Sequence, residues 1–252
     1  MTKYVAKSEM DARMISTVTQ VMASQAYREL TAAQMLGYGL QFVPTLKWLK
    51  FISWHIREEM DHYEAVDRLY KDFTGESVEP VVNARLAKRP IDFATSWFEL
   101  AMAQVLYDRG GYWQLQEYEA CAFAPYGEIV TAILKEEAGH QGQGERIVVE
   151  LCRSGQFDDV KQRAFDKWFK QGMLSFGRPG TEGNRYAIEM GLKKRDSGVV
   201  MQDFLDDIKP AVVASGLVLP KPEAIGLDCP KDLDWSLEGV DPARAQGFAS
   251  AD

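Results

Sequence analysis

The segments Glu58-Glu59-Met60-Asp61-His62 and Glu136-Glu137-Ala138-Gly139-His140 decide the predicted fold, because each contains the spacing Glu-x-x-His. A further carboxylate precedes each motif: Glu29 lies 30 residues before the motif glutamate of the first segment, and Asp108 lies 29 residues before that of the second. The chain has only 3 histidines, and two of them occupy matching places in this doubled pattern. The repetition predicts two similar helical hairpins.

The spacing has a geometric meaning in a helix. Residues three apart share one face of an α-helix, so each motif presents a carboxylate and an imidazole together. Pro44 lies midway between the two carboxylates of the first set, and Pro125 lies just beyond the midpoint of the second. Proline disfavours a helical conformation in the residue before it, so both positions indicate a break between antiparallel partners. Two such hairpins would form an all-α, four-helix bundle with six ligands in its core. The predicted ligands are Glu29, Glu59, His62, Asp108, Glu137 and His140.

Charge favours a metal at these six side chains. Four ionised carboxylates inside a bundle repel one another, and burying an unpaired charge costs several kcal/mol. Two divalent cations would balance them. Carboxylate and imidazole ligands without thiolate suit iron or manganese, and the ligand types do not separate the two metals. The simpler alternative is that both motifs are polar residues on exposed helix faces.

Composition excludes several classes of function. The net charge of −8 argues against general nucleic-acid binding. No apolar run approaches the roughly 18 residues of a membrane span, and the polar N-terminal segment lacks a signal-peptide core. Cys121, Cys152 and Cys229 are widely separated and form no Cys-x-x-Cys site, so we expect reduced thiols and a cytoplasmic protein.

Apolar periodicity predicts the helices and the domain organisation. Helices are expected at about residues 12–40, 45–73, 93–122, 125–152, 158–174 and 199–215. Asp92 is the expected N-cap of the third helix, and residues 74–90 are expected to form a connection. Residues 219–252 are expected to drape over the surface as a tail that Trp235 anchors. Residues 1–154 are then the bundle, and residues 155–252 form a helical extension and tail packed on it within a single domain overall.

Two further features lie beside the predicted ligands. Gly110-Gly111, just after Asp108, indicates a local widening of the helix of the kind that π-bulges produce at functional sites; the alternative is a tolerated glycine pair. His55 lies one turn before Glu59. It either orients that carboxylate or is a satisfied core histidine, and the second interpretation is favoured.

A reduced pair of irons can bind dioxygen and oxidise a nearby substrate, which requires two external electrons. The sequence has no nucleotide-binding glycine motif and no cysteines spaced for an iron-sulfur cluster. We therefore expect the electrons to come from another protein.

The motif segments, together with Tyr107-Asp108-Arg109-Gly110, resemble the metal-binding segments of the phenylacetic acid catabolic family, which includes the catalytic subunits of phenylacetyl-CoA epoxidase. The similarity continues in Phe176-Gly177-Arg178-Pro179 and 214–220, and so covers most of residues 15–222. The resemblance implies a ferritin-like bundle with two iron ions that inserts oxygen into a thioester-activated aromatic ring. It further implies electrons drawn from NAD(P)H through a separate reductase with flavin and an iron-sulfur cluster.

The resemblance also implies partners. One possible partner is a noncatalytic ferritin-like sister subunit that has lost metal ligands. The alternative is that the chain assembles with copies of itself as a homo-oligomer. Because all six ligand positions are filled here, the catalytic interpretation fits this chain better. A di-iron acyl desaturase or hydroxylase shares the doubled motif and stays open, as does a non-enzymatic role in iron storage or as a structural subunit.

Overall fold

The computed structural model describes residues 4–89 and 91–245, and these residues contain helices and no strand. The helices are α1 (Ala12–Gly39), α2 (Leu46–Thr74), α3 (Glu79–Lys88), α4 (Trp97–Ala103), the π-helical η3 (Gln104–Asp108), α5 (Arg109–Gln116), α6 (Ala124–Arg153), α7 (Lys161–Leu174), α8 (Glu182–Glu189) and α9 (Ser197–Ala214). Short 3-10 turns occur at η1 (Lys7–Glu9), η2 (Leu40–Phe42), η4 (Pro222–Ile225) and η5 (Pro242–Arg244). The predicted all-α class, consistent with a ferritin-like bundle, is confirmed. No helix of this described part is long and apolar enough to span a membrane.

The described chain divides into two compact units. The first comprises Met1–Trp97, Leu115–Glu136 and Arg185–Lys194, and the second comprises Phe98–Gln114, Glu137–Asn184 and Arg195–Asp252, within the limits of the described residues. The boundary between them falls inside α6, between Glu136 and Glu137. The predicted division at residue 154 stays a prediction.

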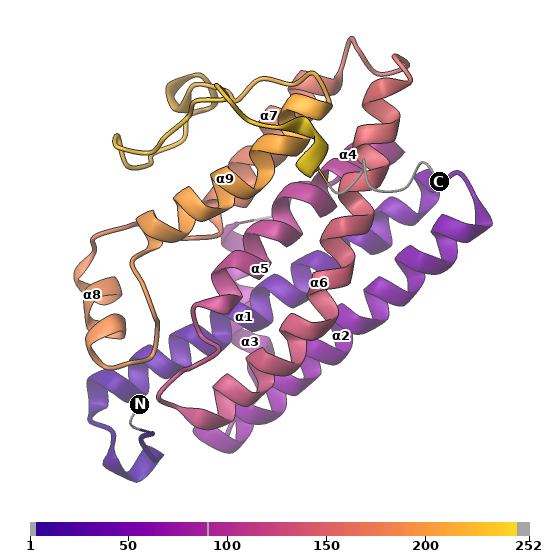
Figure 1. Ribbon diagram of the computed structural model, residues 1–252. Coiled ribbons are helices and arrows are strands. Elements are labelled where there is room, and N and C mark those ends of the chain that lie inside the picture. The colour runs from indigo at the N-terminus through magenta and orange to yellow at the C-terminus, as the bar shows by residue number, and fades with distance from the viewer. Residues whose placement is uncertain (1–3, 90, 246–252) are drawn as a thin grey trace. The chain divides into compact units, whose positions relative to one another are not determined.

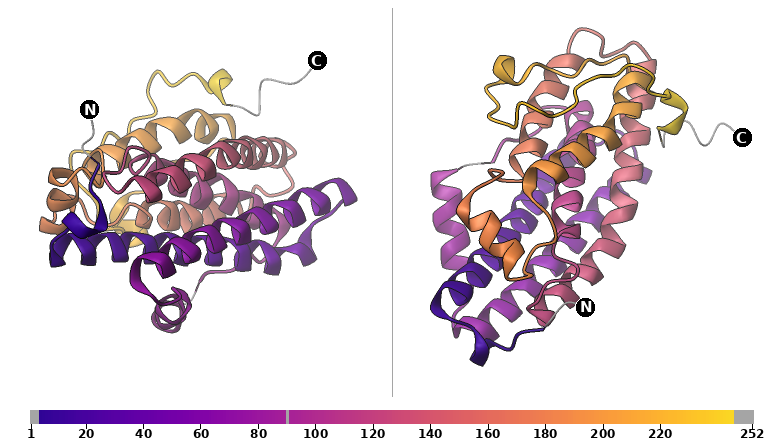
Figure 2. Two further views of the ribbon diagram at one scale, coloured as in Figure 1. Left: turned by 90° about the horizontal axis from the view of Figure 1, so that it is seen from below. Right: turned by 60° about the vertical axis from the view of Figure 1, so that its left-hand side comes forward.

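In the first unit, α1 and α2 form the predicted antiparallel hairpin (Figures 1 and 2). Asp11 caps α1 by accepting a hydrogen bond of 2.7 Å from the backbone N–H of Met14, and Thr45 caps α2 by accepting from Trp48 at 3.3 Å. Because Thr45 directly follows Pro44, the break and the cap coincide. The predicted bounds of both helices are confirmed to within one residue.

Two predictions for this part of the chain were wrong. The connection at residues 74–90 contains a helix, α3, which packs on α1; Pro80 occupies the first turn of α3, where the N–H that proline lacks has no intrahelical partner. Asp92 does not cap the third helix, which begins at Trp97 and ends at Gln116. Pro90, the end of the predicted connection, lies outside the described residues.

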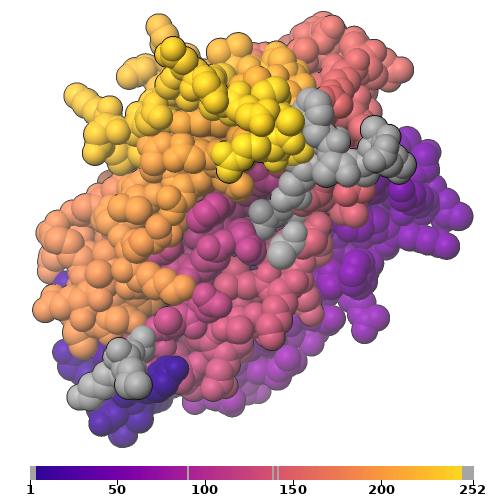
Figure 3. All heavy atoms as spheres, viewed as in Figure 1, coloured from indigo at the N-terminus to yellow at the C-terminus, as the bar shows by residue number. Residues whose placement is uncertain are grey.

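The second unit has an aromatic core around α7 and α9. Phe169 is fully buried, and its ring lies 6.4 Å from that of Phe204 and 5.8 Å from that of Trp235. The predicted anchoring of the tail by Trp235 is therefore confirmed. In Figure 3 the yellow C-terminal segment lies against the adjoining orange surface of this unit. Residues 246–252 of the predicted tail lie outside the described residues.

Candidate metal centre

The first unit gathers three of the six predicted ligands. Glu29 on α1 and both Glu59 and His62 on α2 are only 4%, 2% and 4% exposed. One ligand atom from each lies within 4.8 Å of the others, and His62 Nδ1 is 3.6 Å from Glu29 Oε2. The antiparallel hairpin has thus placed the upstream carboxylate level with the motif, as the sequence predicted. The alternative of polar residues on exposed helix faces does not hold for these buried side chains.

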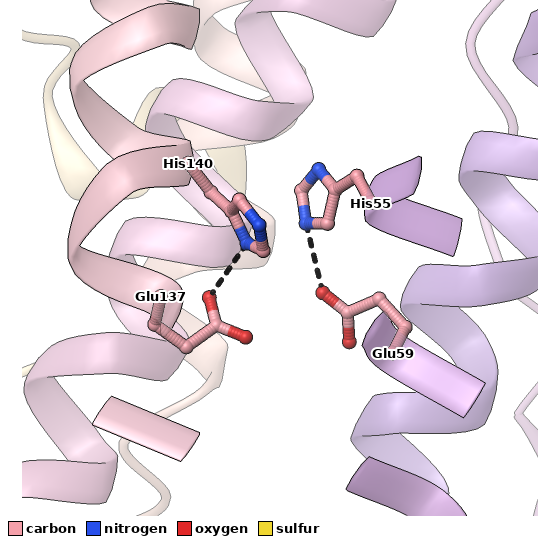
Figure 4. A group of neighbouring side chains, drawn as sticks. All are labelled: His55, Glu59, Glu137 and His140. Carbon is pink, nitrogen blue, oxygen red and sulfur yellow. Dashed lines mark hydrogen bonds and ion pairs between the residues drawn. The ribbon is translucent and has the colours of Figure 1, made fainter. Parts of the chain in front are cut away.

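Neighbouring polar groups hold these three side chains. His55 Nε2 lies 2.9 Å from Glu59 Oε1, one turn away on α2 (Figure 4). Gln25, one turn before Glu29 on α1, donates to the Glu29 carboxylate. His62 Nε2 lies 2.7 Å from Glu136 Oε2, so α2 and the first half of α6 meet here within the first unit. The sequence did not predict Gln25 or Glu136, although Gln25 stands at the helical offset of four that signals a possible partner.

The electrostatics of the first unit favour a carboxylate at Glu29. Burial by itself would raise the pKa of Glu29. Hydrogen bonding and positive charge from His62 outweigh that effect, with smaller contributions from Glu59 and Gln25, so the pKa lies below its ordinary value. Glu29 is therefore ionised at neutral pH.

The second unit contains the other three predicted ligands. Glu137 and His140 lie one turn apart on α6 and are 6% and 2% exposed, with His140 Nδ1 3.5 Å from Glu137 Oε2 (Figure 4). Asp108 is 6% exposed and is the last residue of the π-helical segment η3. The predicted widening of this helix is confirmed, and it lies just before the glycine pair rather than at it.

Close helix packing accounts for Gly110. A Cβ added there would lie 2.7 Å from the backbone oxygen of Gly172 on α7, and a Cβ added at Gly172 would lie 2.5 Å from the backbone oxygen of Leu106. Two glycines therefore let α7 approach the backbone of the helix that carries Asp108. The contact therefore requires a glycine at position 110, and the alternative of a merely tolerated glycine does not hold there.

A buried ion pair follows Asp108 directly. Arg109 is 1% exposed, donates to the carboxylate of Glu145 on α6, and lies 3.6 Å from Asp207 on α9. Trp113, one turn further along α5, donates to the same Asp207 at 2.9 Å. Arg109, which directly follows the predicted ligand Asp108, is thus held by acidic partners on two helices of the second unit. The resemblance included the Asp-Arg pair, but the sequence did not identify Glu145 or Asp207.

The donor set fits a pair of divalent first-row metal ions. It consists of carboxylates and imidazoles that the fold buries at an otherwise prohibitive electrostatic cost, which cations would relieve. Cys121 and Cys152 are buried free thiols outside this set, and burial raises the pKa of Cys121 to about 11. Three of the predicted ligands belong to each unit, so a single centre that uses all six requires the units to meet at these side chains. That requirement is part of the function proposed for the chain.

Comparison with known proteins identifies relatives of this chain. The sequence pattern of the family described as phenylacetic acid catabolic protein matches residues 56–230, which is more than half of the chain. The chain belongs to this family. The matched region includes five of the predicted ligands and leaves out Glu29, which the geometry of the hairpin supplies independently. The resemblance inferred from the motif segments is thereby confirmed.

One curated relative is a subunit of the 1,2-phenylacetyl-CoA epoxidase from Escherichia coli strain K12. It is 20% identical over 217 residues, which cover 82% of this chain and 70% of the relative. The similarity therefore extends well beyond the two motifs.

Proposed function

We propose that this chain is the oxygen-activating component of a di-iron monooxygenase that acts on an aromatic CoA thioester. The observation that carries the proposal is the buried cluster of Glu29, Glu59 and His62 in a member of the phenylacetic acid catabolic family. The similarity to an epoxidase component supports an oxygenase role in phenylacetate catabolism and favours phenylacetyl-CoA or a related thioester as the substrate.

The six side chains would hold the metals as two sets of three. Glu29, Glu59 and His62 come from the first unit, and Asp108, Glu137 and His140 come from the second. The course of α6 supports a common centre. Glu136 contacts His62 at 2.7 Å in the first unit, and Glu137 is the next residue of the same helix. Manganese is the alternative metal, because the donor types suit both.

A bound pair of reduced irons would supply two-electron activation of dioxygen. In the balanced reaction, the aromatic substrate, dioxygen, two electrons and two protons give an oxygenated product and one molecule of water. Buried ligands on rigid helices would keep bulk water from the reacting groups. The electrons would come from NAD(P)H through a separate reductase with flavin and an iron-sulfur cluster, because the sequence offers no site for either group. A ferritin-like sister subunit or a second copy of this chain would complete the assembly, which we place in the cytoplasm.

Isotope labelling tests this proposal. The iron-loaded chain, a flavin and iron-sulfur reductase, NADPH and phenylacetyl-CoA are combined under ¹⁸O₂, and the products are analysed by mass spectrometry. We expect a product that contains one labelled oxygen atom, lost in His62→Ala and retained in Glu64→Ala, a change on the exposed face of α2. Acyl thioesters that lose two hydrogens and gain no label would indicate a desaturase instead. Iron-loaded protein that transforms neither class of thioester would favour the non-enzymatic role.

A further inference from the structure

The histidine that belongs to neither motif, His55, lies beside the predicted ligands of the first unit. His62 and His140 belong to the motifs, whereas His55 lies one turn before the first motif on α2. His55 is 0% exposed, and its Nε2 lies 2.9 Å from Glu59 Oε1. Figure 4 shows the imidazole directed toward one oxygen of the Glu59 carboxylate.

The chemistry of this contact fixes its direction. A carboxylate that binds a metal is ionised and only accepts hydrogen bonds, so in that state Nε2 of His55 carries the proton and donates it. Residues four apart on a helix are held at a fixed offset by the backbone, so the donor cannot drift away from the carboxylate. The ring of Phe51 packs on the imidazole, with 6.1 Å between the ring centroids, and restricts it further.

The same arrangement occurs independently on α1. Gln25 lies four residues before Glu29, is buried, and donates to the Glu29 carboxylate. Both carboxylates of the first unit therefore have a buried donor one turn upstream, and the two donors differ in residue type. A core histidine that only needed a partner would be satisfied by any backbone carbonyl. This repeated pairing with predicted ligands indicates a shared purpose.

We infer that His55 is a positioning residue that orients Glu59 for metal binding by hydrogen bonding to Oε1. This inference rests on the proposed function, because it assigns His55 a role at the same centre. Carboxylates that bind metals are generally held by such outer partners, and loss of a partner lowers metal affinity by about 10- to 100-fold. Gln25 would act on Glu29 in the same way.

Two substitutions at His55 separate positioning from packing. His55→Leu removes the donor and keeps an apolar side chain in the space, whereas His55→Gln retains an N–H donor at the offset that Gln25 uses. Affinity is measured by anaerobic titration of metal-free protein with Fe(II), and with Co(II) as a visible spectroscopic probe. We expect His55→Leu to weaken binding by about 10- to 100-fold and to alter the Co(II) spectrum, and His55→Gln to restore most of both.

Ile52 supplies the matched control. It is fully buried, one turn before His55 on the same helix. Ile52→Val should lower the unfolding temperature of the metal-free protein and leave metal affinity unchanged. If His55→Leu behaves like Ile52→Val, with lower stability and wild-type affinity, the inference is wrong and His55 is a packing residue. If the wild-type protein binds neither ion, the proposed function itself fails.

Discussion

The contact between α7 and the π-helical segment gives the sharpest structural prediction. In Gly172→Ala the new Cβ would lie 2.5 Å from the backbone oxygen of Leu106 and 3.2 Å from Phe204 Cζ. The oxygen belongs to the main chain and cannot rotate away, so the two helices must separate by nearly 1 Å to reach ordinary contact distances of about 3.4 Å. Overpacking of this kind costs about 1–3 kcal/mol, and the backbone clash places the cost near the upper value.

The net effect includes the helix propensity of alanine. Replacing a helical glycine recovers about 1 kcal/mol, so the expected loss in the free energy of unfolding is about 2 kcal/mol. For a chain of this size that corresponds to a fall in unfolding temperature of about 4–8 °C. Because Leu106 is two residues from Asp108, we also expect the variant to retain less iron.

Thermal unfolding followed by circular dichroism measures the first effect, and the iron content of the folded protein measures the second. Gly37→Ala is the control: Gly37 lies in α1, and an added Cβ there meets nothing within 4 Å. The control should be as stable as wild type or up to about 1 kcal/mol more stable. If Gly172→Ala matches the control in both stability and iron content, the close approach of α7 to η3 is refuted.

Three further predictions concern the rest of the fold. Arg109→Leu removes the positive partner of the buried Glu145 carboxylate and should lower the free energy of unfolding in urea by about 3–5 kcal/mol, whereas a loss below about 1 kcal/mol would show that the pair is not desolvated. Trp235→Ala removes the tail's contact with Phe169 and should speed tryptic cleavage of the tail; an unchanged cleavage rate would contradict the anchoring role. Burial raises the pKa of Cys121 to about 11, so the native thiol should resist DTNB at pH 8 and react on unfolding. In the unfolded chain the thiol ionises near its ordinary pKa of 9.0, before the native thiol does. The free energy of unfolding should therefore fall between pH 9 and about 11, by up to about 1.4 kcal/mol per pH unit. A free energy of unfolding that does not change over this range would refute the burial of this thiol.

Local signals in the sequence predicted the long helices well. The capping side chain of Thr45 follows Pro44 directly, and Gly75 ends α2 in the left-handed conformation with φ of 91°. The start of the third helix was predicted less accurately, because Asp92 has the residue type of an N-cap but the helix begins only at Trp97. Helix α3 was missed because residues 74–90 were predicted to be a connection, whereas Pro80 is compatible with the first turn of a helix.

The candidate site shows the same division between local and tertiary information. The pairing of Glu29 with the first motif follows from helical periodicity and the position of one proline, so the sequence predicted it. The contact of His62 with Glu136 and that of Arg109 with Glu145 join residues far apart in the chain. No spacing rule links such residues, and only packing brings them together. His55 lies between these cases, because the sequence offered Glu59 as its partner one turn away but favoured a satisfied core histidine.

Iron stoichiometry tests the central claim most directly. Protein purified from iron-replete cells is assayed for metal, with circular dichroism to establish that each variant is folded. The account predicts about two iron ions per wild-type chain, and a clear loss on replacing either His62 or Asp108 by Ala, one from each unit. A folded wild-type chain that contains no iron and takes up neither Fe(II) nor Mn(II) would contradict it. So would an Asp108→Ala variant that still binds two ions as tightly as the wild type.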